Sequence, residues 1–60
     1  MSKWKVVKIH TGFGTGYTQY RGKSTWVKPL DGPKTGDELL EMDTGAVFMF
    51  DGEEKKWWPL

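Results

Sequence analysis

Glycine and proline residues divide this chain so finely that no long regular element fits between them. Eight Gly and three Pro fall within 60 residues. Glycine weakens helices and strands, and proline interrupts both, so these residues mark turns. The runs between them have the length of strands and contain many of the aromatic and β-branched residues that favour strands. The pattern predicts a single all-β domain over residues 1–60, with five or six short strands.

The chain lacks the usual stabilising devices of very small domains. It has no Cys, and His10 is its single His, which excludes disulfides and metal sites built from Cys and His. Stability must therefore come from packing or from association with another chain. We expect no cofactor. No apolar run reaches the length of a membrane span and no signal-peptide pattern opens the chain, so a cytosolic product without a membrane partner is expected.

Six segments have the composition of strands, and the turns between them are marked by Gly, Pro and Asp. The predicted strands are Lys3–Ile9, Tyr17–Tyr20, Lys23–Lys28, Leu39–Met42, Ala46–Phe50 and Lys55–Leu60. The predicted loops and turns are residues 12–16, Arg21-Gly22, residues 29–36, Asp43-Thr44-Gly45 and Asp51-Gly52. The last three strands predict a β-meander from about Leu39 to Trp58.

The turns of this meander suggest a register. A type I turn with Gly45 in the left-handed conformation, forming a G1 bulge, sets Leu40 opposite Phe48. A four-residue second loop sets Phe48 opposite Trp57, and Val47 opposite Trp58. A small antiparallel sheet and a partly open SH3-like barrel both accommodate these strands.

The segment Ala46–Phe50 is apolar at every position, so both of its faces require cover. The N-terminal strands could cover one face, but the second face needs another subunit or another protein unless the chain closes into a small barrel. The predicted assembly interface comprises Val47, Met49, Trp57 and Trp58. We therefore expect a homo-oligomer or docking on a second protein.

Charge is divided between the two halves of the chain. Residues 1–30 carry six Lys or Arg and no acid, and residues 31–60 carry eight acids against three Lys. Basic and acidic segments could pair within one fold, or between neighbouring subunits.

The basic half also suggests nucleic acid as an alternative partner, because basic and aromatic side chains on small sheets form stacking platforms for single strands. The contacts predicted for this alternative are Trp4, Phe13, Tyr17, Tyr20, Arg21, Lys23 and Trp26. The same aromatic residues would equally serve as the core of a small sheet.

No pattern in the sequence indicates catalysis. Five residues separate Gly16 from Gly22-Lys23-Ser24, where a phosphate-binding P-loop needs four, and the chain is too short for the βαβ unit around it. A lone His10 beside a glycine-rich loop is typical of a surface residue. We expect a protein with no enzymatic activity, no catalytic residues and no small-molecule substrate.

Residues 36–58 resemble a segment of small structural proteins of tailed phages. The matching elements are Glu41, Asp43-Thr44-Gly45, Asp51-Gly52 and Trp57, in that order. The resemblance implies a β module of the phage head, neck, tail or fibre that acts as an oligomer or docks on another virion protein. It would be made in the host cytoplasm and incorporated in the virion.

A second resemblance is to SH3 domains, whose characteristic sequence motifs are similar to Gly36-Asp37-Glu38-Leu39 and Trp57-Trp58. It implies a barrel shape, without the recognition of proline-rich ligands. A small phage-encoded protein that binds single-stranded nucleic acid, or that regulates or inhibits a host protein, is the alternative to the structural subunit.

Overall fold

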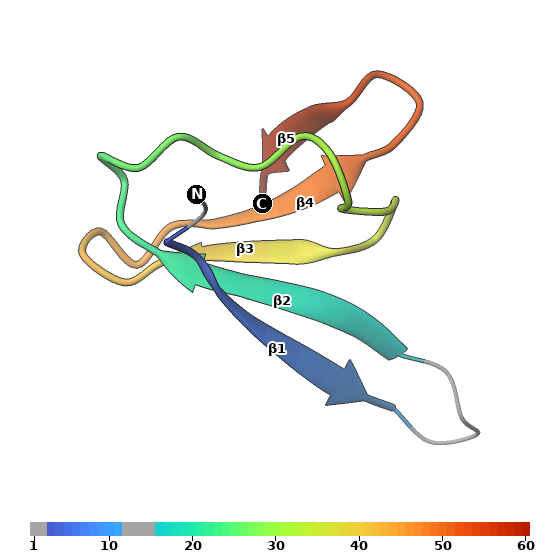
Figure 1. Cartoon of the computed structure of the whole chain (residues 1–60), viewed down its shortest axis with the longest axis horizontal. Coiled ribbons are helices and arrows are strands. Elements are labelled where there is room, and N and C mark those ends of the chain that lie inside the picture. The colour runs from blue at the N-terminus through green and yellow to red at the C-terminus, as the bar shows by residue number, and fades with distance from the viewer. Residues whose placement is uncertain (1–2, 12–15) are drawn as a thin grey trace.

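The computed structural model describes residues 3–11 and 16–60, which form one five-stranded sheet (Figure 1). The strands are β1 Lys5–His10, β2 Gly16–Gly22, β3 Glu38–Glu41, β4 Val47–Asp51 and β5 Lys56–Pro59. They lie in the order β1-β2-β3-β4-β5, with β1 and β5 at the edges. The all-β prediction with five strands is confirmed. The sheet is open and is not closed into an SH3-like barrel.

The sheet is mixed and not wholly antiparallel, because β2 and β3 run parallel to each other. The other three neighbouring pairs are antiparallel, and β3-β4-β5 form the predicted meander. Parallel neighbours need a connection that returns along the length of the strands. Residues 23–37 make this connection without a helix, and we call them the crossover.

The crossover replaces two predicted features. Lys23–Lys28 does not form a strand; a turn closed by the hydrogen bond from Trp26 N–H to Lys23 C=O begins the crossover there. Arg21 and Gly22, predicted as a turn, are the last residues of β2. The predicted loop over residues 12–16 lies outside the described residues except for Gly16, which begins β2.

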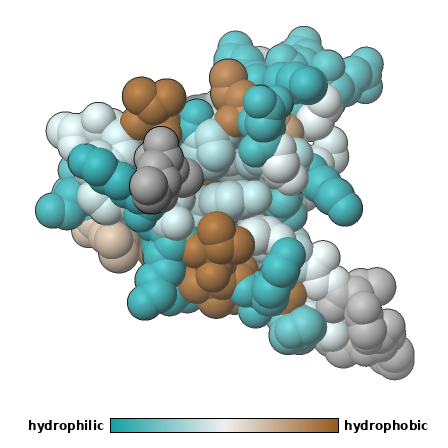
Figure 2. Space-filling model, viewed as in Figure 1, coloured by the Kyte–Doolittle hydropathy of each residue, from teal (hydrophilic) through white to brown (hydrophobic). Residues whose placement is uncertain are grey.

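The strand registers assign each side chain to one of two faces of the sheet. On one face, Trp4, Leu39, Phe50 and Trp57 are buried and form the core, with Tyr20, Trp26 and Phe48 packed against them. The crossover passes in front of β4 and β5 in Figure 1, so it lies over this covered face. Hydrophobic surface on this side is limited to separate patches (Figure 2).

Two indole groups attach the crossover to the core. Trp4 Nε1 donates to the Val27 carbonyl and Trp57 Nε1 donates to the Pro29 carbonyl, each at 2.8 Å. The Trp4 ring also meets Trp26 edge-on, with ring centroids 5.8 Å apart. These hydrogen bonds satisfy the indole N–H groups of both tryptophans and two carbonyl groups of the crossover.

The meander forms as predicted, but its first hairpin has a different register, which exchanges the faces of Leu39 and Leu40. Gly45 has a φ of +78°, as predicted for its turn, yet Leu39 and not Leu40 lies opposite Phe48. Leu39 consequently enters the core, where its side chain is fully buried. In the second hairpin the loop begins one residue later than predicted, because Asp51 still pairs with Lys56.

That shift changes the cross-strand partners of both tryptophans. Trp57 lies opposite Phe50 instead of Phe48, and Trp58 lies opposite Met49 instead of Val47. Each shift spans two residues, so each tryptophan stays on its predicted face.

Candidate functional site: the open face of the sheet

No segment of the described chain covers the sheet face opposite the crossover, and we call it the open face. Its side chains follow from the strand registers. They are Lys5, Val7, Ile9, Tyr17, Gln19, Arg21, Glu38, Leu40, Val47, Met49, Asp51, Lys56 and Trp58. Seven of these thirteen are apolar or aromatic, and none is buried.

The central strand shows the difference between the two faces most clearly. Leu39 on the covered face has no exposed surface, whereas its neighbour Leu40 on the open face remains partly exposed. Met49, on the next strand, is 37% exposed, and Trp58 on the edge strand is 45% exposed. Central strands of a sheet that is covered on both sides would bury these positions.

The total accessible surface agrees with an uncovered face. It is 4433 Å², against about 4,000 Å² expected for a compact monomer of this mass. The accessible surface is thus about one tenth above the average for a monomer of this mass.

The structure separates the four residues of the predicted assembly interface. Val47, Met49 and Trp58 lie together on the open face, in adjacent positions of β4 and β5. Trp57 lies on the opposite face, where it is 8% exposed and belongs to the core. Its assignment to the interface is corrected, because neighbouring residues of a strand point to opposite faces.

The open face also holds two cations in direct opposition. Lys5 and Arg21 are cross-strand partners on β1 and β2. Within the described part of the chain, the ion pair that the structure contains is Lys28–Glu41, so neither Lys5 nor Arg21 is paired with a carboxylate. Arg21 Nε donates to Gln19 Oε1 at 2.7 Å, and Gln19 Nε2 donates to Glu38 Oε1 at 3.3 Å. Opposed like charges destabilise a sheet, and this corner would be stabilised by an added carboxylate.

The residues of the phage-like segment serve the fold and do not form a site. Glu41 accepts hydrogen bonds from Lys28 Nζ at 2.9 Å and from Thr44 Oγ1 at 2.7 Å. Asp43 accepts from the Ser24 amide and hydroxyl. Asp51 accepts from the amides of the turn that follows it. These carboxylates close turns and attach the crossover, which is the role that Asp has in turns generally.

The predicted nucleic-acid contacts are not brought together. Trp4 is buried in the core, and Tyr20 and Trp26 pack against it. Tyr17 and Arg21 lie on the open face, and Lys23 is exposed beyond the end of β2. Phe13 lies outside the described residues. The described aromatic residues of this set are divided between two faces, so they do not form one stacking platform.

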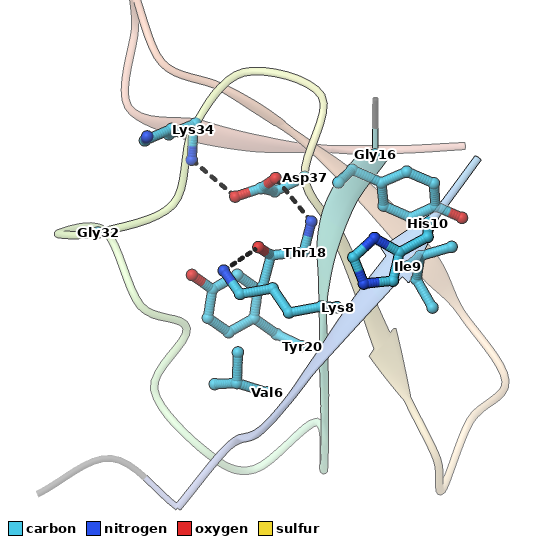
Figure 3. A pocket seen from close by; sticks show the side chains of 11 residues that line it. Val6, Lys8, Ile9, His10, Gly16, Thr18, Tyr20, Gly32, Lys34 and Asp37 are labelled. Atoms are coloured by element: carbon cyan, nitrogen blue, oxygen red, sulfur yellow. Dashed lines mark hydrogen bonds between the residues drawn. The ribbon is translucent and has the colours of Figure 1, made fainter. Parts of the chain in front are cut away.

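A second candidate site missed by the sequence analysis is a cleft of about 370 Å³ between the β1–β2 pair and the crossover. Its polar lining includes Lys8, His10, Thr18, Lys34 and Asp37 (Figure 3). These residues come from three segments that the sequence does not place side by side, and only the crossover brings Lys34 and Asp37 to β1 and β2.

Across residues 3–11 and 16–60, no group of three or more His, Asp or Glu side chains is arranged to hold a metal ion. The same residues include no helix long and apolar enough to cross a membrane.

Comparisons with known proteins do not connect the chain to a family. No family model matches it, and neither the curated proteins nor the solved structures include a match.

Proposed function

We propose that this protein is a non-enzymatic structural subunit that associates with a second copy of itself through the open face. The observation that carries the proposal is the apolar patch of Val47, Met49 and Trp58, partly exposed on two adjacent strands. The likeness of residues 36–58 to structural proteins of tailed phages supports a place in a virion. The resulting pair of sheets would be a building block of the particle.

The size of the open face suits a second copy. Seen along its shortest axis, the molecule measures 35 Å by 25 Å (Figure 1). One face therefore offers at most about 900 Å², and a standard protein interface uses about 800 Å² per partner. Two sheets packed face to face would bury their inner side chains as a β-sandwich does.

Charge favours the same chain as the partner. Lys5 and Arg21 form a basic part on β1 and β2, and Glu38 and Asp51 form an acidic part on β3 and β4 of the same face, where Asp51 also lies opposite Lys56 of β5. If two copies pack face to face about a two-fold axis with their strands crossed, the acidic part of each copy lies over the basic part of the other. Each contact is then made twice, as symmetry requires.

The test is the molar mass in solution from micromolar to millimolar protein, measured by sedimentation equilibrium. The wild-type mass is expected to rise from 6.9 kDa toward twice that value. Met49→Asp places a charge at the centre of the apolar patch and is expected to remain monomeric over the whole range. Met49→Thr keeps a residue that favours strands and is expected to weaken association without disturbing the sheet.

Val27→Asp is the matched control. Val27 is 91% exposed in the crossover, away from the open face, so its substitution is expected to leave association unchanged. A wild-type mass of one chain at every concentration would contradict self-association, and so would equal effects of the Met49 and Val27 substitutions on folded protein. The virion assignment is tested separately, by mass spectrometry of purified particles: recovery in many copies supports it, and absence contradicts it.

A further inference from the structure

The cleft beside the crossover has one wall from the sheet and one from the crossover (Figure 3). Lys8, Thr18 and Tyr20 line it from β1 and β2, and Gly32 and Lys34 line it from the crossover. Gly32 has a φ of +101°, which favours glycine, and a Cβ at this position would have no neighbour within 4 Å, so the rim is open there. The polar groups of the cleft lie on the covered face; Ile9 and Tyr17 of the open face also belong to its lining, but they lie on β1 and β2, away from the apolar patch on β4 and β5.

Positive charge in the cleft is not neutralised by ion pairing. Lys8 Nζ donates to the neutral hydroxyl of Thr18 at 3.1 Å, and the Lys8 side chain lies across the cleft (Figure 3). Lys34 is exposed at the rim, and His10 stands on the other side. No carboxylate of the described chain lies within 4 Å of the ammonium nitrogen of Lys8 or of Lys34; the ion pair of the described residues joins Lys28 and Glu41, outside the cleft.

The one acidic residue of the cleft is already engaged. Asp37 is 7% exposed, and its two carboxylate oxygens accept the backbone N–H groups of Thr18 at 3.0 Å and of Lys34 at 2.9 Å. Charge-assisted hydrogen bonds to two amides stabilise this carboxylate in place. Asp37 therefore fixes the two walls relative to each other, and the ammonium groups remain available to an external anion.

Tyr20 adds a neutral donor beside the cations. Burial, and secondarily the negative charge of Asp37, raises the pKa of the Tyr20 hydroxyl above its ordinary value. The hydroxyl therefore stays protonated at neutral pH and can donate a hydrogen bond. The lining thus combines ammonium, imidazole and hydroxyl groups, which suit the oxygens of a phosphate.

We propose that this cleft binds a phosphate group, carried either by a mononucleotide or by the backbone of a single-stranded nucleic acid. Its volume of about 370 Å³ lies near the lower end of the range for small-ligand sites, roughly 300–1,000 Å³. Lys8 and Lys34 contact the phosphate oxygens from the two walls, and Tyr20 contributes its hydroxyl. One nucleotide unit occupies the cleft at a time.

The experiment titrates the protein at low salt with inorganic phosphate, thymidine monophosphate and oligo-dT, and follows the amide NMR signals of Thr18 and Lys34. All three probes are expected to shift these signals. Lys8→Gln and Lys34→Gln are each expected to weaken binding about two- to fivefold, the range for exposed charge pairs. Lys55→Gln removes the same charge at the exposed turn between β4 and β5 and is expected to change nothing.

The arms of the titration distinguish the two sources of phosphate. Tighter binding of oligo-dT than of the monophosphate, with a steeper dependence on salt, identifies nucleic acid as the source. Equal affinities identify a mononucleotide. The proposal is overturned if the Thr18 and Lys34 signals do not shift with any probe. It is also overturned if Lys55→Gln weakens binding as much as Lys8→Gln and Lys34→Gln do, because the anion would then be attracted to the cation-rich surface in general. Neither result bears on self-association through the open face.

Discussion

Single carboxylates determine how the crossover is attached to the sheet. Glu41 is buried in the last position of β3 and accepts from Lys28 of the crossover and from Thr44 of the next turn. These hydrogen bonds, Lys28 first and Thr44 second, lower the pKa of Glu41 below its ordinary value of 4.5. The hydroxyl and amide of Ser24 lower the pKa of Asp43 below 3.8 in the same way. Both groups therefore link stability to pH.

Acid is expected to destabilise the fold through these two groups. A carboxyl whose pKa is lower in the folded state stabilises the protein above its unfolded pKa, and this contribution disappears as the pH falls through the folded pKa. The free energy of unfolding should therefore decrease as the pH falls below 4.5 for Glu41 and below 3.8 for Asp43. Urea unfolding in a series of buffers from neutral to acidic pH measures it.

Substitution isolates the contribution of Glu41. Glu41→Gln should lower stability at neutral pH and flatten the decrease in acid. Glu54→Gln, at an exposed position of the β4–β5 turn, is the control, and its unfolding free energy should depend on pH as that of the wild type does. A wild-type slope retained in Glu41→Gln would refute the role of this carboxylate.

At the scale of secondary structure, the crossover that joins the parallel strands β2 and β3 packs closely against the end of β2. Gly22 is buried beneath the rings of Trp4 and Trp26. A Cβ on residue 22 would overlap the Trp4 ring and lie 2.7 Å from Trp26 Cε3. Glycine is needed here for space, since Gly22 is not among the glycines with a positive φ.

Gly22→Ala is expected to destabilise the protein by about 1–3 kcal/mol, the usual cost of overpacking a core. The two indoles must move, and the hydrogen bond from Trp4 Nε1 to the Val27 carbonyl lengthens or breaks. Chemical unfolding followed by Trp fluorescence measures the change. Lys23→Ala, at the exposed next residue, is the control. Equal stability of the two variants would show that the indoles adapt without cost.

At the scale of the whole molecule, one face of the sheet has cover and the other has none. Residues 23–37 are the only long connection between strands in the described chain, and this connection covers one face of the sheet only. The open face keeps both its apolar patch and the opposed cations Lys5 and Arg21. A partner that supplies apolar surface and carboxylates would satisfy both.

Self-association should accordingly weaken as salt is added, because screening reduces the attraction between the acidic and basic parts of two copies. We expect the dissociation constant to rise about two- to tenfold between low and high salt, because exposed ion pairs contribute only modest energies. Sedimentation equilibrium at increasing NaCl measures it. Arg21→Gln should reduce this salt dependence, whereas stronger association at high salt would show that apolar contact alone drives assembly.

The local sequence was sufficient to predict the strand character of most segments. Alternating and aromatic-rich runs located β1, β2 and the meander, and Gly45 marked its turn correctly. Trp57 lies on the same face as Phe48, as its predicted register required, but its burial could not be predicted, because its partner, the Pro29 carbonyl, lies 28 residues away. The neighbouring Trp58 has the same local composition and the opposite environment.

By itself the sequence determined an all-β chain without disulfides and with one strand so apolar that both of its faces require cover. Only the tertiary structure decided that β2 and β3 are parallel, and hence that the crossover covers Phe50 and Trp57 while Val47 and Met49 stay partly exposed. The physical reason is range. Strand propensity and turn chemistry act within a few residues, whereas strand order and burial depend on contacts between segments far apart in the chain.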